Sequence, residues 1–306
     1  FSIALTGTPI ENSLLDLWAI LHVVLPNHLG NWGQFKKRFL TPIELGNHSR
    51  LKDLQKLIAP FLLRRKKNEV ANELPPKIEI NEFVTLSTFE RDTYDQLKIQ
   101  AKKIIEDNPQ QAKFLVLSLL TKLRQVCCHR GLVVESASDH SSKLDRAMEI
   151  IRGLQTEQRK VLIFSQFVQL LKKLQTILIN EGLDFCYLDG GTPNHKRQSE
   201  IDRFQETDTS IFLISLKAGG SGINLTSATE VIHLDPWWNP AVEDQASDRA
   251  HRIGQTQTVT VIRLVADDSI ETQILRLQEE KRHIAENLLS DSVSKLSIED
   301  IEQLLN

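Results

Sequence analysis

The chain has little of several residue types whose patterns define other classes of protein. Its 306 residues include three cysteines, an odd number with no CxxC spacing, which is typical of a reducing compartment and argues against a disulfide framework. The cluster Cys127, Cys128 and His129 does not predict a zinc site, because adjacent cysteines cannot easily occupy two corners of one tetrahedron. We therefore expect no metal site formed by this chain alone.

Long apolar runs and nucleotide-binding motifs are also missing. No apolar run approaches the roughly 18–20 residues that a membrane-spanning helix needs, and no signal peptide is visible. Neither a GxxxxGK[ST] phosphate loop nor an acidic DExH-type metal motif occurs. Residue 1 is Phe, and the apolar segment Phe1–Leu5 predicts a buried strand, so we expect the chain to begin inside a domain.

The overall composition is that of a globular protein with room for about two domains. Hydrophobic residues make up 41% of the chain, charged residues 25%, and the formal net charge is −3. That charge argues against a uniformly basic surface, but basic clusters such as 64–67 leave local anion-binding strips open. Charge alone does not identify a partner.

Apolar runs and turn signals predict strands alternating with helices in the second half of the chain. The expected strands are 160–164, 185–188, 211–214 and 230–234, and the expected helices are 142–154, 167–181 and 194–205. This alternation is typical of a parallel, doubly wound α/β sheet, whose ligands bind at the carboxyl ends of the strands.

The rest of the chain is predicted to be mostly helical. Five apolar residues recur at helical spacing before Pro26: Leu14, Leu17, Trp18, Leu21 and Leu25. Pro75-Pro76 marks a boundary, after which we expect a strand at 78–86 and then helices to about residue 135. A charged helix at 269–289 and a short terminal helix are expected to follow the last α/β unit.

The stretch from Ser215 to Gln255 holds the densest set of functional signals. Gly219, Gly220 and Gly222 follow an apolar strand and predict a tight turn whose N–H groups could approach phosphate oxygens. The segment DPWWNP comes next, and then a helix is predicted from Pro240. On that helix Gln245, Arg249 and Arg252 would share one face, where two guanidiniums suit the charge of a triphosphate.

These motifs together resemble the last two helicase motifs of the Swi/Snf family of DNA-dependent ATPases, within superfamily two of helicase-like motors. AGGSGIN, DPWWNP and the Gln245-to-Gln255 segment occur in the family's order and spacing over roughly forty residues. Near the start, LTGTPIEN resembles the family's third motif. The segment LRQVCCHR departs from the usual family form, which has Asn and Pro after the first Cys, and we assign it no chemistry.

The resemblance implies a role for individual residues. Arg252 and Arg249 would act as arginine fingers, and Gln245 would orient them. Residues expected to bind nucleotide or couple its state to DNA are Thr6, Gly7, Thr8, Gly220 and Gly222. Residues expected to contact DNA are Ser165, Gln166, Arg197, Lys217, Gly219 and Trp238. Because two adjacent tryptophans cannot easily enter one core, we expect one of Trp237 and Trp238 to be exposed.

The resemblance also implies an organisation, cofactors and partners. We expect the end of a first RecA-like lobe at 1–70, a linker and helical protrusion at 71–140, a second RecA-like lobe at 141–266 and brace helices at 267–306. ATP and Mg²⁺ would be bound mainly by an N-terminal lobe outside these residues. The main partner would be double-stranded DNA, contacted through its backbone, with nucleosomes, RNA polymerase or other DNA-bound proteins as further candidates and no membrane. Glu11, where many eukaryotic members carry Gln, favours a bacterial protein of the cytoplasm and nucleoid over a nuclear one.

Other interpretations of the same residues stay open. An RNA helicase lobe is one alternative, although such helicases usually end in a QRxGRxGR-like form instead of RAHRIGQ. A stand-alone nucleic-acid or protein-binding module is another. Locally, the arginines could pair with Asp248 or Glu243 on a surface helix, the glycines could form an ordinary turn, and Trp238 could lie in a core.

Overall fold

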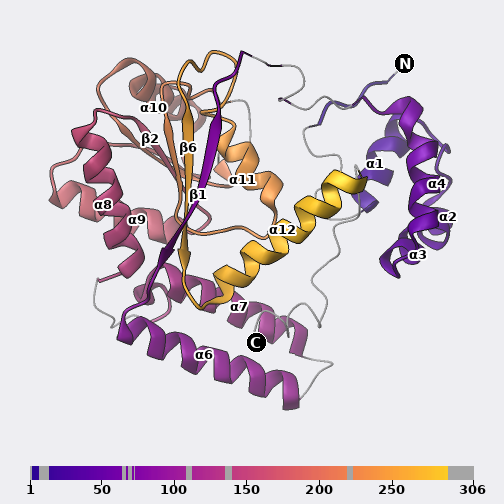
Figure 1. Cartoon of the computed structure of the whole chain (residues 1–306), viewed down its shortest axis with the longest axis horizontal. Helices are drawn as coiled ribbons and strands as arrows, with labels where there is room; N and C mark the ends of the chain where they lie inside the picture. The colour runs from indigo at the N-terminus through magenta and orange to yellow at the C-terminus, as the bar shows by residue number, and fades with distance from the viewer. Residues whose placement is uncertain are drawn as a thin grey trace. The chain divides into compact units, whose positions relative to one another are not determined.

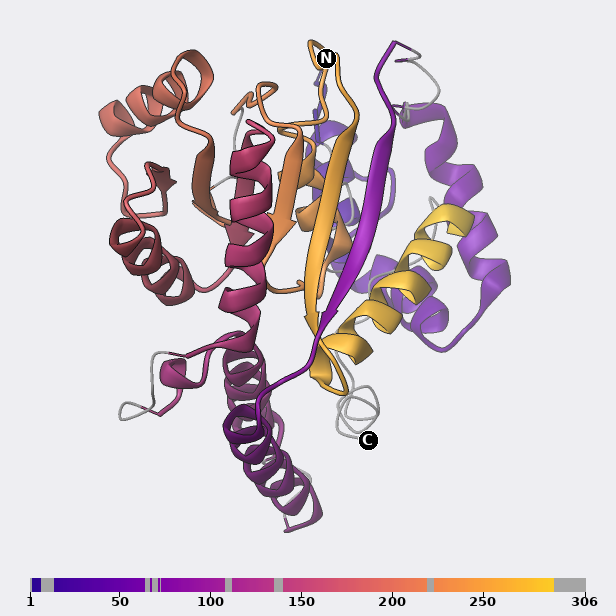
Figure 2. The same cartoon turned by 60° about the vertical axis from the view of Figure 1, so that its left-hand side comes forward.

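The computed structural model describes residues 2–6, 14–63, 67, 71, 73–107, 112–134, 140–218 and 223–288. These residues divide between two compact units, which Figures 1 and 2 show as ribbons. The first unit draws on Phe1–Val70, Asn239–Ala241 and Arg276–Gln303. The second draws on Ala71–Trp238 and Val242–Leu275, with the last three residues. None of the helices within the described ranges is long and apolar enough to cross a membrane.

The first unit is helical in its described part. Its elements are α1 (Leu14–Val24), α2 (Trp32–Phe35), the π-helical turn η1 (Lys36–Leu40), α3 (Thr41–Glu44), α4 (His48–Ile58) and the 3₁₀ turn η2 (Ala59–Phe61). The predicted helix before Pro26 is confirmed, and its leucines enter a core with Phe35, Phe39 and Leu54. The strand predicted at the start is not found: residues 2–6 have no regular structure, and Leu5 is 94% exposed. A strand requires a neighbour for its backbone groups, and no described strand pairs with this segment.

The second unit is built on a six-stranded, entirely parallel sheet in the order β1-β6-β5-β2-β4-β3. The strands are β1 (Lys77–Val84), β2 (Val161–Ser165), β3 (Cys186–Leu188), β4 (Ile211–Ser215), β5 (Glu230–His233) and β6 (Val259–Ala266). The four strands predicted for the second half of the chain are present within two residues of their expected ends. The predicted fold class, a doubly wound parallel α/β sheet, is confirmed.

Helices cover both faces of this sheet. On one face α8 (Ser142–Thr156) and α9 (Val168–Asn180) pack against alternate residues of β2 and β4, including Val161, Ile163 and Leu213. On the other face α10 (Asn194–Glu206) and α11 (Pro240–Ser247) pack against the intervening residues, such as Leu162 and Phe212. Because both faces are covered, β2 and β4 are apolar up to a final serine, which is why the sequence showed continuous runs there instead of alternation.

A helical hairpin and an edge strand complete the second unit. The hairpin helices α6 (Thr88–Asp107) and α7 (Ala112–Cys128) lie side by side (Figure 1). Strand β1, expected in the linker, pairs with β6 over all its eight residues. The sequence did not predict β6. The charged helix α12 (Ile270–Leu288) begins directly after β6 and belongs to this unit as far as Leu275. The four-part division of the chain stays a prediction.

Candidate functional site

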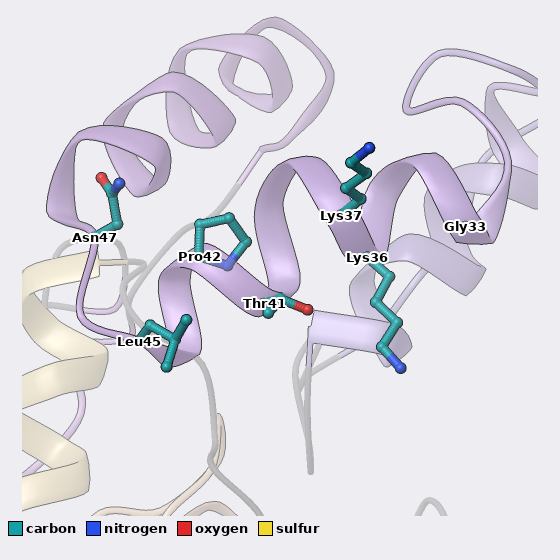
Figure 3. Close-up of a pocket in the computed structure, with 7 residues that line it drawn as sticks. All are labelled: Gly33, Lys36, Lys37, Thr41, Pro42, Leu45 and Asn47. Atoms are coloured by element: carbon teal, nitrogen blue, oxygen red, sulfur yellow. The ribbon is translucent and has the colours of Figure 1, made fainter.

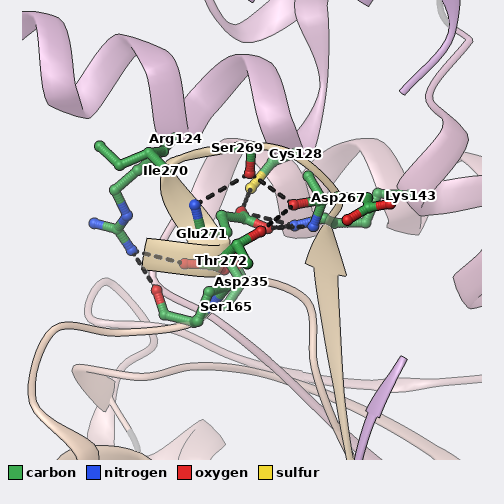
Figure 4. A network of polar contacts seen from close by, with 12 residues as sticks. Arg124, Cys128, Lys143, Ser165, Asp235, Asp267, Ser269, Ile270, Glu271 and Thr272 are labelled. Atoms are coloured by element: carbon green, nitrogen blue, oxygen red, sulfur yellow. Dashed lines mark hydrogen bonds and ion pairs between the residues drawn. The ribbon is translucent and has the colours of Figure 1, made fainter. Parts of the chain in front are cut away.

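Polar side chains gather where the neighbouring strands β2 and β5 end, at the edge of the sheet where ligands of parallel sheets bind. Ser165 ends β2, and Asp235 follows β5; both side chains are fully buried. The Ser165 hydroxyl donates to Asp235 Oδ1 at 2.5 Å, and the backbone N–H of Gln166 donates to the same oxygen at 3.3 Å. Figure 4 shows this pair beside Arg124 of α7. The Asp235 carboxylate therefore ties the ends of two strands together.

The hydroxyl of Ser165 is buried, so the DNA contact predicted for it would have to come from neighbouring residues. Its oxygen also accepts the backbone N–H of Phe167 at 2.9 Å, so the side chain serves the turn after β2. Gln166 is half-buried, and its Nε2 has no hydrogen-bond partner among the described residues. That nitrogen is itself buried, so neither of the two predicted phosphate contacts at this strand end has an exposed donor in its side chain.

The two tryptophans after β5 are both half-buried, so the expectation that one of them would be exposed is wrong. Trp237 packs against the apolar core under α10 and α11, and the buried carboxylate of Glu243 accepts its backbone N–H at 2.5 Å. Both indole rings have the guanidinium of Arg124 above them, 5.1 Å from each ring centroid. The flat guanidinium of Arg124, which belongs to α7, lies against both rings. Local sequence could not reveal this partner.

The loop after β4 begins with Ser215, whose hydroxyl accepts the N–H of Ala218 at 3.3 Å, and leads to the exposed side chain of Lys217. Arg197 of α10 braces this loop from the side. Its guanidinium donates to the carbonyl oxygens of Asp189 at 2.9 Å, Thr192 at 3.1 Å and Ala218 at 3.3 Å. Arg197 is therefore already engaged in joining the loops after β3 and β4, while Lys217 extends outward as a cation.

The predicted helical face carrying Gln245, Arg249 and Arg252 is not formed, because α11 ends at Ser247. Both arginines lie in the turns beyond it. The carbonyl oxygen of Arg249 accepts the N–H of Leu225 at 3.0 Å, and the carbonyl of Ala250 accepts Gln255 Nε2 at 3.2 Å. The N–H groups of Arg249 and Ala250 bond to the carbonyls of Ala246 and Ser247, three residues back instead of four, so the chain continues as tighter turns. Gln245 is exposed on α11. Because no shared helical face is formed, it does not orient the two arginines in the way that was predicted.

The two arginines have different environments. Arg249 is 6% exposed and donates through Nη1 to the carbonyl oxygen of Ile223 at 3.5 Å. Burial lowers the pKa of Arg249, and the positive charge of Arg252 nearby lowers it further. Arg252 is exposed, and its guanidinium has no hydrogen bond or ion pair within the described ranges. Neither arginine pairs with Glu243, whose carboxylate accepts Arg263 Nε at 2.9 Å.

Sequence reasoning missed Gln255, which organises the segment carrying both arginines. Its buried Nε2 lies 2.9–3.2 Å from the carbonyl oxygens of Thr226, Ala228 and Ala250. Its Oε1 accepts the backbone N–H groups of Thr256 and Gln257, both at 2.9 Å. The preceding Gly254 has φ +102°, a conformation that favours glycine. The sequence feature that could have indicated this role is the position of Gln255 directly after Gly254, at the end of the recognised motif.

Several predicted residues cannot be placed. Gly7, Thr8, Gly219, Gly220 and Gly222 lie outside the described residues, as do Arg64 and Arg65 of the basic cluster. Thr6 is described and exposed, and it belongs to the first unit. Their predicted roles in binding nucleotide and DNA stay predictions.

The first unit has a hollow of about 550 Å³ beside η1 and α3. Figure 3 shows Lys36 and Lys37 pointing to opposite sides of the η1 turn, away from one common focus. No motif residue lines this hollow, so we assign the candidate function to the strand ends of the second unit. There, an exposed ammonium and two half-buried indoles suit binding to phosphates and to bases or sugars. The exposed guanidinium of Arg252 lies in the segment after α11, whose His251 and Gln255 side chains bond to the carbonyls of Pro75 and Ala228, residues that precede β1 and β5.

Comparison with known proteins gives a consistent result over the whole chain. Residues 2–132 match the family model of the SNF2-related domain, and residues 142–254 match that of the helicase conserved C-terminal domain. An uncharacterized ATP-dependent helicase of Mycoplasma genitalium is 40% identical over 309 residues, which cover 100% of this chain and 29% of the relative. The human SWI/SNF-related matrix-associated actin-dependent regulator of chromatin subfamily A member 1 is 35% identical, covering 98% of this chain and 31% of that protein. The chain thus spans about a third of the length of these relatives.

Solved structures agree. The Sulfolobus solfataricus SWI2/SNF2 ATPase core in complex with double-stranded DNA is 36% identical, with a TM-score of 0.64, covering 99% of this chain and 66% of that one. The C-terminal domain of the Sulfolobus ATPase is 31% identical, with a TM-score of 0.61, and 97% of it is covered by 74% of this chain.

Proposed function

This chain belongs to the Swi/Snf family of ATP-dependent helicases, and on that premise we propose that it is the C-terminal part of a motor that steps along double-stranded DNA. The parent protein would hydrolyse ATP between two RecA-like lobes, of which the six-stranded sheet is the second. Because these 306 residues contain no phosphate loop, ATP and Mg²⁺ would be held mainly by residues outside them. The chain alone should therefore hydrolyse no ATP.

The observation that carries the proposal is the contrast between Arg249 and Arg252. Arg249 is buried and fixes the segment after α11 by donating to Ile223. Arg252, three residues later, is exposed and has no protein partner for its guanidinium among the described residues. A cation that is held at its base and left unpaired at its tip is suited to act as an arginine finger. Such a residue stabilises the charge on the transferring phosphoryl group and is worth about 10³–10⁵ in rate.

DNA would be contacted at the strand ends of the second unit. Lys217 is exposed after β4, and Gln166 and Trp238 are half-buried after β2 and β5. A cation beside an indole at these strand ends suits the phosphates and sugars of a duplex, and phosphate contacts position a protein without reading sequence. The Sulfolobus relative bound to double-stranded DNA supports this choice of ligand. The bacterial relative supports a bacterial protein, and nucleosomes, RNA polymerase or other DNA-bound proteins are its candidate partners.

The test is Arg252→Lys in the full-length protein. Lysine keeps the charge but loses the planar fork that matches phosphate. We expect kcat for DNA-stimulated hydrolysis to fall by about 10²–10⁴, with affinities for a nucleotide analogue and for DNA within a few-fold of the parent, because the contact forms only in the transition state. Single-turnover hydrolysis at saturating duplex DNA measures the first quantity, and equilibrium binding the second.

Arg152→Lys is the matched control. Arg152 is an exposed arginine of α8 bonded to Glu181, and we expect its replacement to leave hydrolysis unchanged. Normal turnover by Arg252→Lys would refute the finger role. Structured RNA run in parallel with duplex DNA distinguishes the alternative function: stronger stimulation by RNA would favour an RNA helicase. Turnover by the isolated 306 residues would refute the division of the ATP site.

A further inference from the structure

Arg124, in the hairpin helix α7, occupies a position to which the sequence assigned no chemistry. It belongs to the segment LRQVCCHR, and its side chain is 2% exposed although it carries a full charge. Burying a guanidinium is costly unless charged and polar groups surround it. The contacts of Arg124 therefore indicate what the residue does.

Among the described residues, the hydrogen bond, the ion pair and the ring contacts of the Arg124 guanidinium lie on the segments that follow β2 and β5. Nη2 donates to the carbonyl oxygen of Pro236 at 2.7 Å and lies 3.6 Å from Asp235 Oδ2. The guanidinium carbon is 5.1 Å from the ring centroids of both Trp237 and Trp238, and 5.6 Å from that of Phe167. Figure 4 shows Arg124 reaching from its helix to Asp235 and Ser165. The Arg124 side chain thus contacts every residue from Asp235 to Trp238, and it contacts Trp237 and Trp238 through their rings.

The geometry requires arginine. A guanidinium is flat, so it can face aromatic rings while its edge donates to a carbonyl and a carboxylate. A lysine ammonium could remain near Asp235, but it has no plane to lie against two indoles. The carboxylate of Asp235 is itself fixed by Ser165 and by the N–H of Gln166. The segment 235–238 is therefore held by hydrogen bonds at the end of β2 and by Arg124 of α7.

We propose that Arg124 is a positioning residue that connects the α6–α7 hairpin to Trp237 and Trp238 and sets the direction in which the Trp238 ring meets nucleic acid. The hairpin and the tryptophan segment then move as one body. The nucleic-acid half of this proposal rests on the proposed function, whereas the positioning half does not.

The test compares Arg124→Lys with Arg91→Lys in the full-length protein. Arg91, on α6, is half-buried and has contacts of the same kinds: it donates to the backbone carbonyls of Asp267 and Asp268 at 2.8 Å, and it lies over the ring of Tyr94. It anchors the hairpin without touching the tryptophans. The lysine variants keep their charge, so Asp235 is not left buried without a cation in the first of them.

The first readout is hydrogen exchange of the Trp237 and Trp238 amides without DNA. Arg124→Lys should raise their exchange rate about tenfold, which corresponds to about 1.4 kcal/mol, and Arg91→Lys should leave it unchanged. Equal exchange in the two variants would overturn the proposal. Because no DNA is present, this result stands even if duplex DNA does not stimulate the parent protein, which would count against the proposed function alone.

The second readout is the duplex concentration that gives half-maximal ATPase activity. Arg124→Lys should raise it about tenfold while kcat at saturating DNA stays within about threefold, because positioning affects binding more than chemistry. Trp238→Ala should raise it by a similar factor. If Arg124 acts through the indoles, the double variant should match Trp238→Ala within about twofold. Multiplied effects in the double variant would show that Arg124 acts elsewhere and would overturn the proposal.

Discussion

Replacing Lys143 by methionine should strongly destabilise the second unit. Lys143, at the start of α8, and Glu271, at the start of α12, are both fully buried, and Nζ lies 2.7 and 2.5 Å from the two carboxylate oxygens (Figure 4). Burial alone would lower the pKa of Lys143, but the Glu271 carboxylate outweighs it and raises that pKa, so the ammonium persists.

The magnitude follows from what remains after the change. Breaking a buried ion pair by removing one partner costs about 3–5 kcal/mol, because a charge is left uncompensated. Glu271 would keep the hydrogen bond from the N–H of Ala266 at 2.8 Å, so we expect about 3 kcal/mol, the lower end of that range. The double variant Lys143→Met/Glu271→Gln has no buried charge, and we expect it to lose about 1 kcal/mol, far less than the sum of the single variants.

The pH dependence gives a second check on the same variant. Burial already raises the pKa of Glu271, and without the ammonium its carboxyl binds a proton more readily in the folded than in the unfolded state. A pKa raised on folding contributes stability that is present at low pH and is lost as pH rises through the folded value. Lys143→Met should therefore approach the parent in stability as the medium is acidified.

Native-state hydrogen exchange of α8 amides measures the local free energy of opening, without requiring that the whole protein unfold in one step. Arg146→Met is the control. Arg146 is in the same helix, but its pair with Glu149 is 41% and 59% exposed, so the change should cost less than about 1 kcal/mol. A loss as small for Lys143→Met as for Arg146→Met would refute the reasoning, as would a loss that does not shrink at low pH.

Two further predictions concern buried polar groups near the candidate site. Gln255→Ala should leave the carbonyls of Thr226 and Ala228 unpaired and lower the free energy of unfolding by about 1–3 kcal/mol. Amide hydrogen exchange around Arg252 should become faster. Unchanged exchange there would show that Gln255 does not organise that segment. Burial, with a contribution from the Arg263 charge, lowers the pKa of His233 from 6.5 to about 3. A lowered histidine pKa gives stability that is present above 6.5 and lost as pH falls, so His233→Gln should reduce the slope of unfolding free energy against pH by up to about 1.36 kcal/mol per unit between pH 6 and 4, measured by acid titration. An unchanged slope would mean that His233 is protonated in the folded protein.

The parts of the fold that sequence predicted are those fixed by local pattern. Strands β2 and β4 are nearly continuous apolar runs, because helices cover both faces of the sheet. Strand β6 alternates between buried and half-buried residues over its first half, from Val259 to Ile262, which made its pattern weaker. The pairing of β1 with β6 joins residues 182 positions apart, such as Lys77 and Val259, and no local pattern can encode that distance.

The site was predictable in its residue types but not in its geometry. Helical spacing placed Arg249 and Arg252 on one face, yet α11 ends at Ser247, and Leu225 and Gln255 bond to carbonyls of the turns beyond it. The tryptophans appeared too close together for both to be buried, because the cation that lies over them comes from α7, more than a hundred residues earlier. In both cases a tertiary contact decided the outcome over the local preference.

The pairing of β1 with β6 also determines the order of events during synthesis. In the described sheet, β6 is the neighbour of β1, and β5, β2, β4 and β3 lie beyond it. At about 5–20 residues per second, a ribosome needs roughly 10–35 s to make the 182 residues that separate paired positions such as Val84 and Ala266. Throughout that interval the backbone of β1 has no strand to pair with, and the hairpin that follows it is made long before its anchor at Asp267. Strand β1, at the edge of the nascent sheet, is thus the last strand to be paired, and its backbone is exposed to aggregation for the longest time. This makes β1 the natural segment for a chaperone to hold.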